Sequence, residues 1–465
     1  MKTTTEIVHE LIDKGVLVTP AMLKTIQAQN SQATNTPQTT TPPPVHLVKN
    51  YTKKTTKREV ADFVQHYTIR FKTIERMIRQ RPEARGTTTI QRAMQSQAET
   101  STIIGMICEK QETKNKNIIL EVEDLTGRAK VIISQNNNEL LQQAKDLFLD
   151  EIIGITARKG DGVFFATDII HPDIPFHELK KSPEERYIAV IGDLHFGSKK
   201  FLAEEFNKFL EWINGNVGSE SQKRIAQLVD YLIFIGDVVE GVGVYPGQEE
   251  DLTHTSIKEQ FKGFATLLKK IPSSKRIIIG PGNHEPVRLA EPQPPIPQDL
   301  APELYNMPNV TLTSNPATFI LNKTNTFPGL TILYYHGYSI PYYADNIPSI
   351  RAGGGLKKVD LIMKELLKRR HLAPTHNSNQ YLPDPEEDHL IIDTIPDIFI
   401  TGHVHRVAVS SYKNVTIING SCWTDMTENQ EKRGLENQPG KVPLINTQTR
   451  EVRILNFHKE TNQRS

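Results

Sequence analysis

Short apolar runs fill the chain after residue 100, and they differ between residues 100–170 and the part that begins at residue 187. The earlier runs predict five strands, at 102–108, 117–123, 129–134, 151–157 and 162–170, with a helix from Asn138 to Phe148 after the third strand. From residue 187 on, strand-like runs alternate with helical stretches, and most of these runs are apolar throughout. Continuously apolar strands are typical of a sheet covered on both faces, so this half predicts an α/β domain.

The strands expected in the α/β half are 187–191, 231–235, 276–279, 331–335, 397–400 and 415–418, and the expected helices include 202–213, 255–270 and 357–370. In the earlier half, three strands, a helix and two strands make the order of an OB-fold barrel. Barrels of this kind bind single-stranded nucleic acid or dock onto proteins. Few aromatic residues lie on these strands apart from Phe164 and Phe165, and this favours protein docking over base stacking.

The amino-terminal part has a different composition. Residues 1–30 carry apolar stripes that predict a small helical docking module, because so short a unit buries little surface by itself. Residues 31–58 are rich in Thr, Asn, Gln and Pro and predict a disordered linker. Helical spacing returns over 60–81. The predicted domains are therefore 1–30, the linker 31–58, a helix plus barrel at 59–180, and the α/β domain at 181–465.

Composition narrows the class of protein. The chain has 465 residues, of which 37% are hydrophobic, and no apolar run approaches the roughly 20 residues of a membrane helix. The amino terminus shows no apolar signal core, so we expect a cytoplasmic protein with no membrane partner. Its two cysteines, Cys108 and Cys422, lie far apart and predict neither a disulfide framework nor a structural zinc finger.

Positive charge is concentrated in one stretch, although the net charge is only +1. Residues 49–95 hold twelve Lys and Arg against four Asp and Glu. Such a stretch either contacts phosphate groups or forms a solvated helix face next to a linker. The sequence leaves both alternatives open.

Five polar clusters each follow an apolar run in the α/β half. They read Gly-Asp-Leu-His at 192–195, Gly-Asp-Val-Val-Glu at 236–240, Gly-Asn-His-Glu at 282–285, His-Gly at 336–337 and Gly-His-Val-His at 402–405. Open α/β sheets bind ligands at the carboxyl ends of their strands, so we expect these clusters to converge. Carboxylate, amide and imidazole groups suit a pair of divalent metals that hold a phosphate ester and activate water against it. Hydrolysis of a phosphodiester is the leading hypothesis.

The order of these clusters resembles the calcineurin-like metallophosphoesterase superfamily over residues 187–420. The resemblance implies a β-sandwich flanked by helices and a site for two divalent metal ions, commonly manganese. It implies that one ion is held by Asp193, His195, Asp237 and His405, and the other by Asp237, Asn283, His336 and His403. It also implies that His284 contacts the phosphate and protonates the leaving 3′-oxygen. We expect Glu240 and Glu285 to accept hydrogen bonds rather than to bind metal.

A closer resemblance covers nearly the whole chain. An OB-like segment directly before such a domain, together with the phrases at 241–250, 368–374 and 395–405, is similar to the small-subunit family of archaeal family-D DNA polymerases. This resemblance implies a 3′→5′ exonuclease that proofreads for a large catalytic subunit. The implied partners are that large subunit, the single-stranded 3′ end of DNA and the sliding clamp. The basic residues between 357 and 370 either track the DNA backbone or form a solvated helix face.

Two alternatives to the proofreading hypothesis stay open. The first is a phosphoprotein phosphatase or a small-molecule phosphodiesterase of the same superfamily, against which the barrel and the linker argue. The second is a non-catalytic scaffold subunit, against which the full set of ligand residues argues.

Overall fold

The computed structural model describes residues 42–54, 56–426 and 436–458. The predicted helical module at 1–30 and the first part of the predicted linker lie outside these residues. The rest forms one compact unit that begins at Pro42. In the part of the chain that is described, no helix is both long and apolar enough to cross a membrane.

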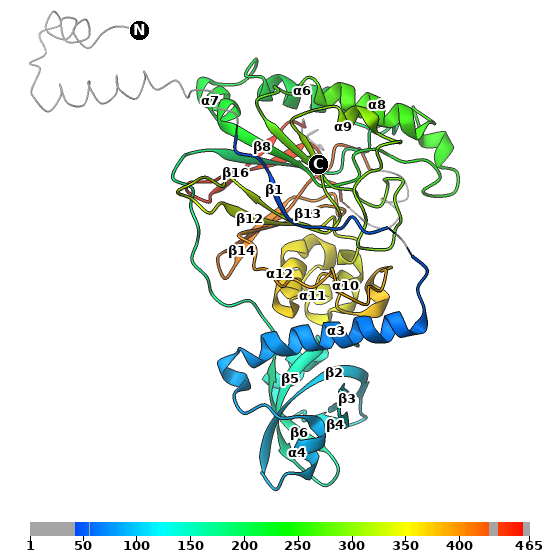
Figure 1. The fold of residues 1–465 in the computed structure, drawn as a ribbon, viewed down its shortest axis with the longest axis vertical. Helices are drawn as coiled ribbons and strands as arrows, with labels where there is room; N and C mark the ends of the chain where they lie inside the picture. The colour runs from blue at the N-terminus through cyan, green and yellow to red at the C-terminus, as the bar shows by residue number, and fades with distance from the viewer. Residues whose placement is uncertain (1–41, 55, 427–435, 459–465) are drawn as a thin grey trace, which may run out of the picture. The chain divides into compact units, whose positions relative to one another are not determined.

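Two six-stranded sheets make up the α/β half (Figure 1). The first has the order β1-β11-β12-β13-β15-β14, formed by His46–Asn50, Ala317–Leu321, Leu330–Tyr334, Ile398–Thr401, Val415–Asn419 and Ala408–Tyr412. The second has the order β10-β9-β8-β7-β16-β17, formed by Val310–Leu312, Arg276–Ile279, Val229–Phe234, Tyr187–Ile191, Lys441–Asn446 and Val452–Asn456. All six strands predicted for this half are present, within two residues at each end, and the α/β class is confirmed.

The two sheets pack face to face. Alternate residues of their central strands, such as Ile188 and Ile233 on one sheet and Phe319 and Ile332 on the other, share one fully buried apolar cluster. Side chains of opposite parity on the same strands point outward and pack under helices. The strands are therefore apolar on both faces, which explains why their sequences read as continuous apolar runs.

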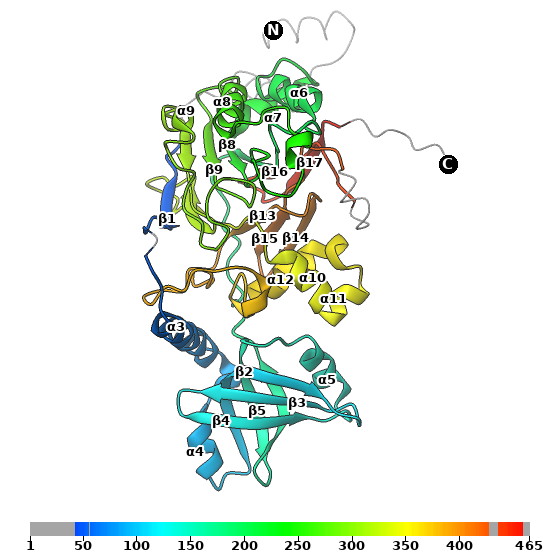
Figure 2. The same cartoon turned by 90° about the vertical axis from the view of Figure 1, so that its right-hand side faces the viewer.

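Helices cover both outer faces of this sandwich, as Figures 1 and 2 show. The helices over the β8 sheet are α6 (Ala203–Ile213), α7 (Glu220–Leu228), α8 (Ile257–Leu268) and α9 (Pro302–Tyr305). Those over the β13 sheet are α10 (Ile340–Asn346), α11 (Pro348–Ala352) and α12 (Val359–Arg369). This four-layer arrangement leaves the strand ends as the places where polar loops gather.

A separate closed barrel lies in sequence between β1 and the other strands of the sandwich (Figure 2). Its strand order is β2-β3-β4-β6-β5, formed by Thr100–Glu112, Ile118–Asp124, Gly127–Ile133, Phe164–Ile170 and Ile152–Lys159. Helix α5 (Asn138–Lys145) lies between the third and fourth strands in sequence, and α4 (Ile90–Gln95) packs on the barrel core. The five predicted strands and the predicted helix are confirmed, and their order is that of an OB-fold.

Buried ion pairs join the long helix α3 (Val60–Arg79) and the barrel to the sandwich. Arg70 on α3 is fully buried, and its Nε donates to Asp388 Oδ2 at 2.5 Å. At the other contact, Arg369 on α12 pairs with Glu151 of the barrel, and both side chains are buried. Breaking either pair would leave an uncompensated charge in the interior, so these contacts hold the two parts in one arrangement.

Two predictions require correction. The predicted linker is not disordered over 46–50, because these residues form β1, which pairs antiparallel with β11. Lys49 of this strand binds Glu387 and Asp393, and such partners far away in sequence are not visible in local composition. The basic residues at 369 and 370 do not track DNA, since both side chains are buried and bind protein groups, Arg369 at Glu151 and Arg370 at the carbonyls of Ile392 and Asp393.

Candidate metal centre

The five polar clusters meet at the carboxyl ends of β7, β8, β9, β12 and β13. Their close approach depends on small residues. A Cβ placed on Gly282 would lie 2.3 Å from Asp237 Oδ1, and one placed on Gly192 would lie 1.7 Å from the carbonyl oxygen of Ser421. Only glycine fits at these two positions, so the loops contact one another through their backbones.

Four of the predicted ligand residues have a left-handed backbone. The φ angles are 53° at His195, 47° at Asp237, 68° at His403 and 56° at His405. This conformation costs an ordinary residue roughly 1–2 kcal/mol, and such residues cluster at functional sites. Here the left-handed turns follow directly on the strands and bring side chains from β7, β8 and β13 to one place.

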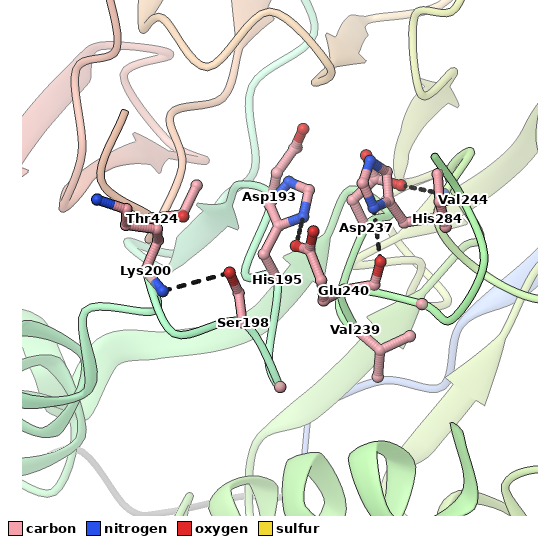
Figure 3. A network of polar contacts seen from close by, with 12 residues as sticks. Asp193, His195, Ser198, Lys200, Asp237, Val239, Glu240, Val244, His284 and Thr424 are labelled. Atoms are coloured by element: carbon pink, nitrogen blue, oxygen red, sulfur yellow. Dashed lines mark hydrogen bonds and ion pairs between the residues drawn. The ribbon is translucent and has the colours of Figure 1, made fainter. Parts of the chain in front are cut away.

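The first group of ligand-type atoms belongs to Asp193, His195 and His405, which lie within 4.8 Å of one another. His195 Nδ1 donates to Glu240 Oε2 at 2.8 Å, so the lone pair of a neutral ring lies on Nε2 (Figure 3). That Nε2 is 3.1 Å from His405 Nε2, and His405 Nε2 is 3.3 Å from Asp193 Oδ2. Three lone-pair-bearing atoms thus face one point.

The second group belongs to Asp237, His336 and His403, also within 4.8 Å. His336 Nδ1 donates to the carbonyl oxygen of Ile235 at 2.8 Å, which leaves Nε2 as the ligand atom. This Nε2 lies 3.3 Å from Asp237 Oδ2 and 3.1 Å from Asn283 Oδ1. All seven residues predicted as ligands are therefore in the two groups or in contact with them. Asp237, which the resemblance implies holds both ions, belongs only to the second group, and His195 also forms a group with Glu240 and His284.

Glu285 ties two of the loops together. Its carboxylate is buried and accepts hydrogen bonds from the backbone N–H groups of Gly282, Asp237 and Val238, at 2.6, 3.0 and 2.7 Å. Burial and the nearby Asp237 raise the pKa of this carboxyl to about 7. Glu240 and Glu285 both accept hydrogen bonds, as expected, and Glu285 does so from backbone rather than from a ligand side chain.

His284 lies beside both groups. Its Nδ1 donates to the carbonyl oxygen of Glu240 at 2.7 Å (Figure 3), and its backbone N–H donates to Asp237 Oδ1 at 2.8 Å. The ring stands edge-on to His195, with centroids 4.6 Å apart. Since Nδ1 is occupied, Nε2 is the atom that a substrate would meet.

The electrostatics of the centre favour added positive charge. Burial lowers the pKa of His336, but Asp237, Asp193 and the Ile235 carbonyl together outweigh burial and raise the pKa to about 10. The pKa of His403 falls to about 3 because of burial and the nearby His336. Asp193 Oδ1 is buried without a hydrogen-bond partner among the described residues, which is costly for a carboxylate oxygen unless a cation meets it. The donor set fits divalent metal ions held by oxygen and imidazole nitrogen.

Sequence reasoning missed a pair of buried amides that support the second group. Asn315 Oδ1 accepts from the backbone N–H of His336 at 2.8 Å, and Gln293 Nε2 donates to the carbonyl oxygen of Gly282 at 2.9 Å. The two side chains bond to each other at 2.7 Å. Neither residue stands in a polar cluster after a strand, so no local pattern marks them.

Comparisons with known proteins agree on one family. The model of the family of B subunits of DNA polymerases alpha and epsilon matches residues 188–409. The DNA polymerase II small subunit of Methanothermobacter thermautotrophicus is 36% identical over 391 residues, 84% of this chain and 78% of that protein. Its namesake in Archaeoglobus fulgidus is 35% identical over 399 residues, 86% of this chain and 78% of that protein. The chain spans a smaller share, 65%, of the Methanocaldococcus jannaschii protein of the same name.

One solved structure with some similarity, described as a novel archaeal phosphodiesterase, is 15% identical, covers 58% of this chain and 98% of its own, and gives a TM-score of 0.28. So low a score says nothing about fold or chemistry.

Proposed function

The chain belongs to the family of DNA polymerase II small subunits, and from this premise we propose that it is a 3′→5′ exonuclease that removes nucleotides from DNA ends for its polymerase. The substrate is the single-stranded 3′ end of DNA. The partner is the large subunit that carries out synthesis, and the resident cofactor is a pair of divalent metals, of which manganese is the first to test.

One observation carries the proposal: two groups of ligand atoms lie next to each other in the same centre. Asp193, His195 and His405 make one, and Asp237, His336 and His403 make the other. A subunit that served only as a scaffold would gain nothing from four left-handed ligand residues and a buried, unpartnered carboxylate oxygen. Those features cost stability, and a metal-dependent function accounts for them.

Each residue has a part in the proposed hydrolysis. Two divalent cations would supply Lewis-acid stabilisation of the phosphate and a lowered pKa for the attacking water. Glu240 and the Ile235 carbonyl fix the tautomers of His195 and His336, so that both present Nε2. His284 Nε2 donates a proton to the leaving 3′-oxygen, while Nδ1 stays bonded to the Glu240 carbonyl.

The test measures digestion of DNA labelled at its 5′ end, as a single strand and as a duplex with a mismatched 3′ terminus. We expect manganese-dependent shortening from the 3′ end, with and without the large subunit present. Asp237→Asn should abolish it, and His284→Ala should slow it roughly 10²- to 10⁴-fold. His284→Ala should have much less effect on a p-nitrophenyl phosphodiester, because that leaving group needs no proton.

A matched control is His376→Ala, which removes an exposed histidine outside the centre. If the purified protein shortens no DNA under either condition, the nuclease proposal is wrong and the scaffold hypothesis is favoured. If it hydrolyses phosphopeptides or cyclic nucleotides faster than DNA, the phosphatase alternative is favoured.

A further inference from the structure

A basic groove lies on the barrel, at the start of β2. It has a volume of about 550 Å³ and is lined by two arginines and several hydroxyl groups, from Arg85, Arg92, Thr88, Ser96, Thr100 and Ser101 among others. No carboxylate is among the described residues that line it. Both arginines are exposed, and neither side chain makes a hydrogen bond or an ion pair with any described residue.

These two arginines belong to the basic stretch 49–95, in which charges have two fates. Five of the other ten basic residues pair with carboxylates of the described residues: Lys49, Lys53, Arg70, Arg79 and Arg81. Arg85 and Arg92 are among those that make no such ion pair, and they differ from the rest in lining a groove. Their charge is available to an anion from solution.

Strand pairing adds a third arginine to the same face. Arg158 on β5 pairs with Thr100 on β2, and directly paired residues present their side chains on the same face of a sheet. The second pair along lies on the same face, and there the hydroxyl oxygens of Thr102 and Thr156 are 3.1 Å apart. Arg158 is exposed and makes no ion pair with any described residue.

An exposed aromatic ring completes the row. Phe165 on β6 pairs with Arg158, so Thr100, Arg158 and Phe165 lie side by side on three adjacent strands. Strand spacing places Phe165 about 10 Å from Thr100. The ring is 45% exposed and lies over the turn at Gly160, where a Cβ would come within 2.7 Å of it. A ring held in this way offers a flat face at little entropic cost.

The neighbouring strand β4, which pairs with β6, carries its charges in a different arrangement. Arg128 on β4 is exposed as well, but its guanidinium binds Glu123 at 2.9 Å and Glu121 at 3.3 Å. Lys130 on the same strand pairs with Glu121 on β3. Arg128 is paired with carboxylates, whereas Arg85, Arg92 and Arg158 make no ion pair with a described residue. One exposed carboxylate, Asp168, lies on the same face, opposite Thr156 on the adjacent strand.

We propose that this face, defined by Arg85, Arg92, Arg158 and Phe165, binds single-stranded nucleic acid, with the arginines on backbone phosphates and Phe165 stacked on a base. A groove with unpaired positive charge beside an exposed aromatic ring is what such a strand requires. Arginine and exposed aromatic residues also occur in protein interfaces, so the test includes binding of the large subunit. The site is distinct from the metal centre, so it stands whether or not the chain is a nuclease.

The test measures binding of a fluorescent oligothymidylate of about 20 nucleotides to the whole protein by anisotropy. A chelator is present, so that no cleavage occurs. Replacing Arg85, Arg92 and Arg158 together with Gln should weaken binding and reduce the slope of log K against log salt by about 2, near 0.7 per lost phosphate contact. Phe165→Ala should weaken binding roughly five- to a hundredfold and leave the slope unchanged.

Arg128→Gln is the matched control, and it should change neither the affinity nor the slope. Thermal unfolding identifies any variant that fails to fold, and Phe165→Leu then replaces Phe165→Ala. If the triple variant binds the oligonucleotide as the unmodified protein does, the proposal is overturned. It is also overturned if the variants lose the large subunit while binding DNA normally, because the face is then a protein interface. If the variants lose DNA binding as expected, but the unmodified protein shows no nuclease activity, only the nuclease proposal is refuted.

Discussion

Glu240→Ala should weaken one of two metal-binding steps and leave the other unchanged. Glu240 Oε2 accepts from His195 Nδ1 at 2.8 Å, and this bond both orients the ring and keeps the lone pair on Nε2. Carboxylates in this position typically contribute 10- to 100-fold to metal affinity. That factor corresponds to about 1.4–2.7 kcal/mol for the group of Asp193, His195 and His405.

The second group should be insensitive because its histidine is held differently. His336 Nδ1 donates to the backbone carbonyl of Ile235, and a substitution at residue 240 leaves that carbonyl in place. The structure thus predicts an asymmetric effect, which a general loss of folding would not produce.

The assay is isothermal titration calorimetry of the metal-free protein with Mn²⁺. We expect two binding steps for the unmodified protein and a 10- to 100-fold weaker constant for one of them in Glu240→Ala. Glu240→Gln keeps an acceptor oxygen, so its weakened constant should lie between that of the unmodified protein and that of Glu240→Ala. The reasoning is refuted if both steps weaken equally, or if both constants stay within twofold of their original values.

Three further predictions concern stability. Burial lowers the pKa of His371 from 6.5 to about 4, so the unfolded chain binds the proton first, and the stability from this residue is lost as pH falls between these values. His371→Gln should reduce the loss of stability between pH 7 and pH 4, measured by urea unfolding, by roughly 3 kcal/mol, and an unchanged loss would contradict the shift. Arg70→Met should cost about 3–5 kcal/mol in the same assay, whereas adding Asp388→Asn should restore part of it, because the amide removes the unpaired charge and keeps an acceptor oxygen beside His371 and the Leu390 N–H; a double variant as unstable as Arg70→Met would contradict the buried pair. Gln293→Leu should cost about 3 kcal/mol, because the carbonyl of Gly282 and the amide of Asn315 lose their partner, and a change under 1 kcal/mol would argue against that role.

Periodicity predicted the barrel strands and six strands of the sandwich, which are short, apolar and bounded by turns. Six other strands were missed: β1, β10, β11, β14, β16 and β17. All but β1 pair with a strand next to them in the chain, so a distant partner explains only the miss of β1. β1 has few large apolar residues, and its hydrogen bonds come from β11, about 270 residues away in sequence.

The candidate ligands could be predicted for a different reason. Each stands directly after a buried strand, and the sheet brings the ends of such strands together, so Asp193, Asp237 and His336 meet without any local signal between them. The groups that hold the ligands follow no such rule. Glu285 and Gln293 act on backbone atoms of loops brought near only by folding, and the burial of Arg369 depends on a carboxylate of the barrel.

β1 has a practical consequence for anyone who shortens this protein. It occupies one edge of its sheet, where it takes up the hydrogen-bonding groups of β11. A version that starts after Asn50 would leave β11 as a bare, apolar rim, the kind of surface on which copies of a protein add to one another as fibres or precipitates. Keeping residues from Pro42 on should therefore decide whether a trimmed sample stays monodisperse.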